Sequence, residues 1–186
     1  MEDRTLKELK ELVEKAKNGD KEAFSLIYQK FFTPLYRYIY FRVGSKEDAE
    51  DLIQEVFTKA YLSFSKFKFT GSSPLAYFYT IARNTIIDQG RKKKHNIDSD
   101  DDVDSHKGDG DSPEESAAKN EDAKMLKLAI EELTESEQDV IIMKFFDGLS
   151  NKEIAEILGK EEGAVRQLQS RGLRDLRDIL KKKNEQ

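Results

Sequence analysis

The chain has 186 residues, 37% of them charged, and a formal net charge of −5. It contains no cysteine, which excludes a disulfide framework and a thiolate metal site and fits a reducing compartment. No window approaches the roughly 18 apolar residues of a membrane span, the N-terminus lacks the apolar core of a signal peptide, and the acidic balance argues against a protein that coats DNA unaided.

Helical periodicity dominates the chain and strand-like alternation is scarce, so we predict an all-α fold. Apolar residues at helical spacing between 6 and 16 predict a short N-terminal helix, and Asp20 is the expected cap of the next one. Thr33 followed by Pro34 is typical of a cap and a first helical position. We therefore expect a further helix to start there and to stop at Gly44.

The helix expected at about 46–66, capped by Ser45 with Asp48, has two different faces. Its core face carries Ala49, Leu52, Ile53, Val56, Phe57, Ala60 and Phe64. The other side carries Asp51, Gln54, Glu55, Thr58 and Leu62. A solvated acidic face is the commonest fate of such residues, but a leucine among carboxylates indicates a protein partner.

A loop with two aromatic residues, FKFTGSS at 67–73, precedes the next predicted helix, which starts at Ser73-Pro74 and runs to about Lys94. One stripe of this helix carries Tyr77, Thr80, Asn84, Asp88 and Arg91. The basic run at 91–94 is weak evidence alone, because the helix dipole favours cations at a C-terminus.

The segment 95–112 has no apolar periodicity and is dense in aspartate, so we predict a disordered linker that divides the chain into two domains. His95 and His106 have no metal-like spacing and are expected to be solvated. Helix is predicted to restart at Ser112-Pro113, and Thr134 with Glu137 forms another capping box before an apolar helix.

The stretch 149–180 has the pattern of a helix-turn-helix. Ser150 and Glu153 predict a capping box, and Gly159 predicts the turn. The second helix has an apolar face of Val165, Leu168, Gly172, Leu176 and Ile179. Its opposite face carries Arg166, Gln167, Ser170, Arg171, Arg174 and Arg177, side chains that suit base edges and phosphates of the major groove.

The plainer alternative for this helix is an amphipathic helix with a solvated basic face, since helix-turn-helix geometry also occurs in proteins that never touch DNA. The short first helix, the glycine turn and the arginines on one face of the second helix together favour a DNA-binding role. No catalytic constellation, phosphate loop or metal motif is present, so we expect neither an enzyme nor a cofactor or metal site.

Three of these runs resemble segments of bacterial sigma factors. DAEDLIQEVFTKAY (48–61) resembles their core-polymerase-binding helix, and SPLAYFYTIARNTIIDQGRKK (73–93) resembles their promoter-melting and minus-ten-reading segment. LTESEQDVIIMKFFDGLSNKEIAEILG (133–159), with the following helix, resembles their minus-thirty-five-reading domain. The chain is similar to the compact extracytoplasmic-function (group IV) sigma factors, which keep only regions 2 and 4.

The resemblance implies two small helical domains: a region 2 bundle in 1–94 and a region 4 helix-turn-helix in 113–186, joined by the flexible acidic linker 95–112. Two departures stand out. Many members have Trp-Leu where Tyr77-Phe78 stand, and Lys-Ser-Arg-Leu-His-Arg-Ala-Arg where 166–173 reads RQLQSRGL. The second departure moves the buried leucine by one position, to Leu168.

The resemblance also implies the roles of individual residues. Core polymerase binding falls to Asp48, Asp51, Gln54, Glu55, Thr58 and Leu62. Minus-ten reading and melting fall to Phe67, Lys68, Phe69, Thr70, Gly71, Ser72, Ser73, Tyr77, Thr80, Asn84 and Arg91. Minus-thirty-five reading falls to Ala164, Arg166, Gln167, Ser170, Arg171, Arg174 and Arg177.

The expected protein is cytoplasmic, binds core RNA polymerase and promoter DNA without inserting into a membrane, and has an anti-sigma factor as a further candidate partner. Two alternatives stay open at this point. One is a stand-alone helix-turn-helix transcription regulator whose N-terminal half senses or dimerises. The other is a helical protein-interaction module with no role on DNA.

Overall fold

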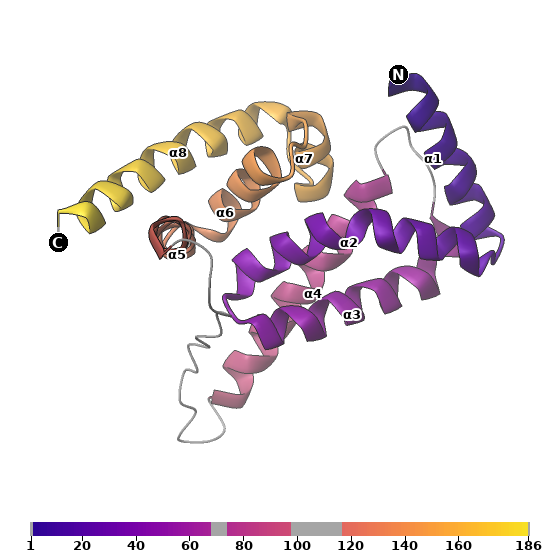
Figure 1. The fold of residues 1–186 in the computed structure, drawn as a ribbon, viewed down its shortest axis with the longest axis horizontal. Coiled ribbons are helices and arrows are strands. Elements are labelled where there is room, and N and C mark those ends of the chain that lie inside the picture. Colours follow the sequence, from indigo (N-terminus) through magenta and orange to yellow (C-terminus); the bar gives the residue numbers. More distant parts are fainter. Residues whose placement is uncertain (1, 68–73, 98–116, 186) are drawn as a thin grey trace.

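The computed structural model describes residues 2–67, 74–97 and 117–185, and these residues form helices without a strand among them (Figure 1). The first group is α1 (Glu2–Lys17), α2 (Lys21–Val43), α3 (Lys46–Ser63), the 3-10 turn η1 (Phe64–Lys66) and α4 (Pro74–Ile97). The second group is α5 (Ala117–Glu131), α6 (Glu135–Ile141), the π-helical turn η2 (Ile142–Phe146), α7 (Asn151–Leu158) and α8 (Glu162–Asn184). The all-α prediction is confirmed.

The predicted helix start at Thr33-Pro34 is wrong, because α2 continues from Lys21 to Val43 with Pro34 inside it. An internal proline lacks the amide hydrogen that a helix needs and costs about 3 kcal/mol. Phe31 and Leu35, one turn apart around the proline, are both buried. Their packing against α3 and α4 offsets the cost, so one long helix forms where the sequence predicts two.

The core of the first group lies between α2, α3 and α4. The predicted core face of α3 is confirmed, since Ala49, Leu52, Val56 and Ala60 are at most 1% exposed. The N-terminus of α3 is capped by the Ser45 hydroxyl, which accepts the Asp48 amide at 3.3 Å. The helix α4 extends to Ile97 and so overlaps the first residues of the segment predicted as a linker. The predicted helix restart at Ser112-Pro113 lies outside the described residues.

The second group is built around α8. The predicted capping box at Ser150 and the left-handed turn at Gly159 (φ 61°) are confirmed and set the angle between α7 and α8. On α8, Val165, Leu168 and Leu176 are buried as predicted. Gly172 lies where a Cβ would approach Ile141 of α6 to 3.1 Å, so glycine allows close packing of α6 on α8.

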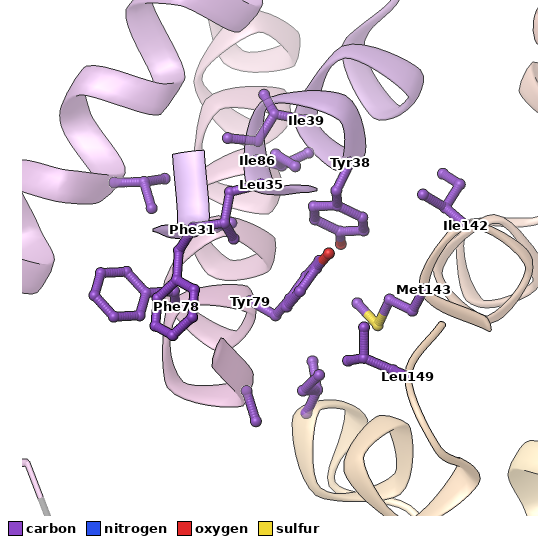
Figure 2. Packing of buried hydrophobic residues seen from close by; sticks show 14 of the residues in the cluster. Phe31, Leu35, Tyr38, Ile39, Phe78, Tyr79, Ile86, Ile142, Met143 and Leu149 are labelled. Atoms are coloured by element: carbon purple, nitrogen blue, oxygen red, sulfur yellow. The ribbon is translucent and has the colours of Figure 1, made fainter. Parts of the chain in front are cut away.

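The two groups pack against each other. Helix α7 lies against α4, while α5 and η2 lie against α2 (Figure 1). The Phe41 and Phe146 rings meet across this boundary with centroids 4.8 Å apart. Figure 2 shows Tyr38 and Tyr79 of the first group directed toward the side of Ile142, Met143 and Leu149. None of the described helices is both long and apolar enough to cross a membrane.

Candidate protein and nucleic-acid interfaces

The acidic face predicted on α3 is exposed. Asp51, Gln54, Glu55 and Thr58 are all solvent-accessible, and Leu62 has 74% of its surface exposed. Asp48, at the N-terminal end of the helix, is only half-buried. These residues share one side because the core residues of α3 occupy the other side at helical spacing. The result is a row of acidic and polar side chains with one protruding leucine, which suits a basic protein surface.

The stripe predicted on α4 is likewise on the surface. Thr80, Asn84 and Arg91 are exposed, and Tyr77 is half-buried. The Thr80 hydroxyl donates to the carbonyl of Ala76 at 3.0 Å, a bond within its own helix. The amide of Asn84 and the guanidinium of Arg91 can meet bases and phosphates of a single strand.

An aromatic cluster joins the two ends of the predicted base-capturing loop. Phe67 stacks on Phe64 with centroids 5.7 Å apart and meets Tyr77 of α4 at 4.8 Å. The Tyr77 hydroxyl is 2.6 Å from that of Ser63, which fixes the ring in place. The structure thus brings Phe67 and Tyr77 together, ten residues apart in sequence. The other predicted loop residues, Lys68, Phe69, Thr70, Gly71, Ser72 and Ser73, lie outside the described residues.

The outward row predicted on α8 is confirmed as exposed for Arg166, Gln167, Ser170, Arg171, Arg174 and Arg177, whereas Ala164 is half-buried. Three of the arginines form ion pairs with acidic neighbours on α8: Arg166 with Glu162 at 3.5 Å, Arg174 with Asp175 at 3.2 Å and Arg177 with Asp178 at 3.4 Å. Exposed pairs of this kind are worth about 0–1 kcal/mol, so these guanidiniums can exchange them for phosphates.

Sequence reasoning missed a polar network between the two helical groups. Asp147, directly after η2, has a side chain with no exposed surface. Its carboxylate accepts from Nε of Arg37 at 2.9 Å, from the second terminal nitrogen of Arg37, and from the Tyr79 hydroxyl at 2.6 Å. Arg37 belongs to α2 and Tyr79 to α4, so one carboxylate of the second group holds two helices of the first.

A second buried carboxylate, that of Asp139 in α6, also joins α2 and α4 of the first group. It accepts from the Tyr38 hydroxyl at 2.8 Å and from Nε of Arg83 at 3.0 Å. Arg42 places its Nε 3.1 Å from the same carboxylate and donates to the side chain of Gln138. Nothing in the local pattern around Asp139 or Asp147 indicates these contacts, because their partners lie 56 to 110 residues away.

The electrostatics of the network follow from burial. Burial raises the pKa of Asp147 above its usual value, although the hydrogen bonds from Tyr79 and Arg37 act in the opposite direction. Burial, reinforced by the neighbouring aspartates, also raises the pKa of Tyr38 and of Tyr79. Both phenols therefore stay neutral hydrogen-bond donors. Among the described residues no group of His, Cys, Asp and Glu side chains could hold a metal ion.

Two family models match the chain, one in each of its two helical groups. The Sigma-70 region 2 model matches residues 27–96, and the Sigma-70 region 4 model matches residues 123–176. The first match covers most of α2 to α4, and the second runs from Ala123 within α5 to Leu176 within α8.

The names of similar proteins agree with these two family models. The chain is 35% identical over 172 residues to the ECF RNA polymerase sigma factor BldN of Streptomyces coelicolor, covering 91% of this chain and 65% of that protein. It is 31% identical over 182 residues to the ECF RNA polymerase sigma factor SigW of Bacillus subtilis, covering 93% of this chain and 97% of that protein.

Two solved structures share the fold. One is CnrH in complex with the cytosolic domain of CnrY, with a TM-score of 0.71, 20% identity and coverage of 91% of this chain and 95% of that one. The other is the sigma factor RpoE of Bartonella quintana with the anti-sigma factor NepR, with a TM-score of 0.69, 24% identity and coverage of 85% and 96%. With two family models matched in order and a relative aligned over nearly its whole length, the chain belongs to the ECF RNA polymerase sigma factors and serves promoter-specific initiation of transcription.

Proposed function

We propose that residues 1–94 act as the polymerase-binding and minus-ten domain and residues 113–186 as the minus-thirty-five domain, with 95–112 as the linker between them. The observation that carries the proposal is the separation of charge. The acidic face of α3 lies on the first helical group, and the arginine row of α8 lies on the second. One chain thus offers an acidic surface for a protein and a basic surface for DNA, at a net charge of only −5.

The acidic face of α3 would bind a basic surface of core RNA polymerase. Asp51 and Glu55 supply negative charge. Leu62 is exposed in the free chain and would bury its apolar surface against the partner. An anti-sigma factor would cover the same face and is a further candidate partner.

The aromatic cluster at Phe67 and Tyr77 would support the capture of a flipped non-template base. Removing a base from the stack costs a few kcal/mol. Stacking on an aromatic side chain returns about 1–3 kcal/mol per base. Asn84 and Arg91, exposed further along α4, would then follow the single strand.

The helix α8 would enter the major groove of the minus-thirty-five element. Arg166, Gln167 and Ser170 lie near its N-terminal end, the end that reads base edges in helix-turn-helix docking. Arg174 and Arg177 lie about two and three turns beyond Arg166 and would meet the DNA backbone. The linker 95–112, on the order of 60 Å long when fully extended, would let the two domains reach separate elements.

In this role the chain has no active site of its own, and the chemistry belongs to the polymerase, a cytoplasmic enzyme. Run-off transcription from genomic fragments with added core polymerase tests the proposal. Discrete transcripts that need both core enzyme and this chain are expected. A chain carrying Asp51→Lys and Glu55→Lys should give none. The matched control Glu11→Lys with Glu14→Lys, at exposed positions of α1, makes the same change in net charge and should match the unsubstituted protein. Transcripts that do not depend on the added chain would refute the proposal.

A further inference from the structure

Helix α8 leaves an apolar side chain exposed within its arginine row. Leu173 has 43% of its surface exposed, whereas Leu176, three residues later, is 9% exposed and belongs to the core. Leu173 follows Ser170 by three residues and precedes Arg177 by four, so these three residues share one side of the helix. All three are exposed. The leucine therefore lies on the side of α8 that is turned away from the core.

A single exposed leucine is common on protein surfaces and indicates no partner when it stands alone. The neighbours of Leu173 give it a partner. Arg166 lies two turns before it and Arg177 one turn after it, both exposed on the same side of α8. A molecule that binds both arginines also covers the leucine between them. In the proposed function that molecule is the DNA of the minus-thirty-five element.

Leu173 is close enough to the N-terminal part of α8 to enter the same groove. A rise of about 1.5 Å per residue places it on the order of 10 Å beyond Arg166 along the helix axis. The major groove is about 12 Å wide, so both side chains can lie in it. A leucine side chain is shorter than an arginine side chain. It therefore contacts only groups that project from the base edges toward the helix.

The chemistry of the groove selects one such group. The base edges in the major groove present hydrogen-bond donors and acceptors, and thymine adds a C5-methyl group. A leucine has no hydrogen bond to offer to the donors and acceptors, and it has no charge for a phosphate. Contact with the methyl group removes apolar surface of both partners from water, which is favourable. The best partner for an exposed leucine in this row is therefore a thymine.

We propose that Leu173 is a specificity-determining residue, which packs on the C5-methyl group of one thymine in the minus-thirty-five element. This contact rests on the proposed function, because it needs α8 to lie in the major groove of that element. It adds an apolar contact to the hydrogen bonds assigned to Arg166 and Gln167. The minus-thirty-five element should thus hold a thymine whose methyl group contributes to binding.

Deoxyuridine tests the contact, because it pairs as thymidine does and lacks only the methyl group. In a promoter found by run-off transcription, the thymines of the minus-thirty-five element are replaced one at a time. Binding of the chain together with core polymerase is then measured by competition with a labelled duplex. One replacement should weaken binding about fourfold, the equivalent of one buried methyl group. The ratio should stay constant across a salt series, because the contact neutralises no phosphate.

Leu173→Ala should weaken binding to the thymine promoter and should bind the thymine and uracil promoters alike. Leu173→Met, which keeps an apolar side chain, should restore most of the difference. Leu128→Ala is the matched control, because Leu128 of α5 is 40% exposed and lies outside the arginine row. It should keep the fourfold difference. Arg174→Ala should weaken both promoters equally and keep the ratio, since a phosphate contact is independent of the methyl group.

Two results would overturn the leucine contact: a promoter whose thymines all tolerate deoxyuridine, or a Leu173→Ala protein that keeps the fourfold difference. A promoter with a scrambled minus-thirty-five element separates this failure from failure of the proposed function. Polymerase-bound protein that prefers the cognate element but ignores the methyl group would refute the leucine contact alone. Equal binding to the cognate and scrambled elements would refute the docking of α8 in the groove, and the leucine contact with it.

Discussion

Arg171 of α8 pairs with Glu137 of α6 at 2.8 Å, and the Glu137 side chain is only 3% exposed. The same carboxylate accepts the amide and the hydroxyl of Thr134, at 3.1 and 2.7 Å, where α6 begins. One glutamate thus joins the start of α6 to the middle of α8. Arg171 was predicted to contact DNA, and in the free chain it also holds the second helical group together.

This pair predicts that the arginines of α8 differ in their effect on folding. Arg171→Ala should lower the free energy of unfolding by about 1–2 kcal/mol, a value reduced for the exposure of the arginine, because a buried carboxylate loses a charged donor. Arg174→Ala removes an exposed arginine whose ion pair is with the partly exposed Asp175, and it should change the free energy of unfolding by about 0.5 kcal/mol or less. Urea unfolding of both variants measures the difference. Equal losses would mean that the Arg171–Glu137 pair adds nothing to stability.

The arginines should also differ in their effect on promoter binding. Arg166→Ala or Gln167→Ala should cost about 1–3 kcal/mol on the cognate upstream element and relax preference at one base pair. Arg174→Ala should weaken all sequences alike and reduce the salt slope by about one. The measurement is polymerase-bound protein on single-base promoter variants across a salt series. If Arg174→Ala changed base preference and Arg166→Ala did not, α8 would dock differently.

Charge reversal on α3 should abolish polymerase binding. Asp51→Lys with Glu55→Lys places cations where a basic partner approaches, while both positions are exposed and off the core face. The helix should fold as before. Glu11→Lys with Glu14→Lys, on exposed positions of α1, makes the same change in net charge and is the control. A pull-down in which the α3 variant still recovers core enzyme would place the polymerase interface elsewhere.

The raised pKa of Asp147 predicts a pH dependence of stability. With Arg37 and Tyr79 around it, the folded chain still binds a proton at this carboxyl more readily than the unfolded chain, whose value is near 3.8. The stabilisation from that proton is complete below the ordinary pKa and is lost as pH rises through the raised one. The unsubstituted protein should therefore gain stability relative to Asp147→Asn as pH falls from 7 toward 4. Urea unfolding at several pH values checks this, and a constant difference would contradict the raised value.

Much of the fold could be predicted because its signals are local. Capping residues such as Ser150, the glycine turn at Gly159 and the apolar spacing of α3 each act within a few residues, and the structure agrees with all three. Leu168 is 7% exposed, so the shifted leucine of α8 is buried as the sequence predicted. Pro34 is the exception, because packing against distant helices outweighs the local preference that proline carries.

The contact between the two helical groups could not be predicted in the same way. Arg37 and Asp147 are 110 residues apart, and each resembles any surface charge in its own segment. Tyr79 and Arg83 lie on a different side of α4 from the stripe of Thr80 and Asn84. Helical periodicity does not indicate which residues contact that side. Such pairs depend on the tertiary contact between the two folded helical groups, which local sequence does not encode.

The most direct test of the account is a gel shift on one promoter fragment with and without core polymerase. The free protein should bind duplex DNA weakly and with little sequence preference, because its net charge is −5 and its basic residues occupy only part of the surface. With core polymerase it should bind the specific promoter tightly. Equal specific affinity in both conditions would contradict the account and favour a stand-alone transcription regulator.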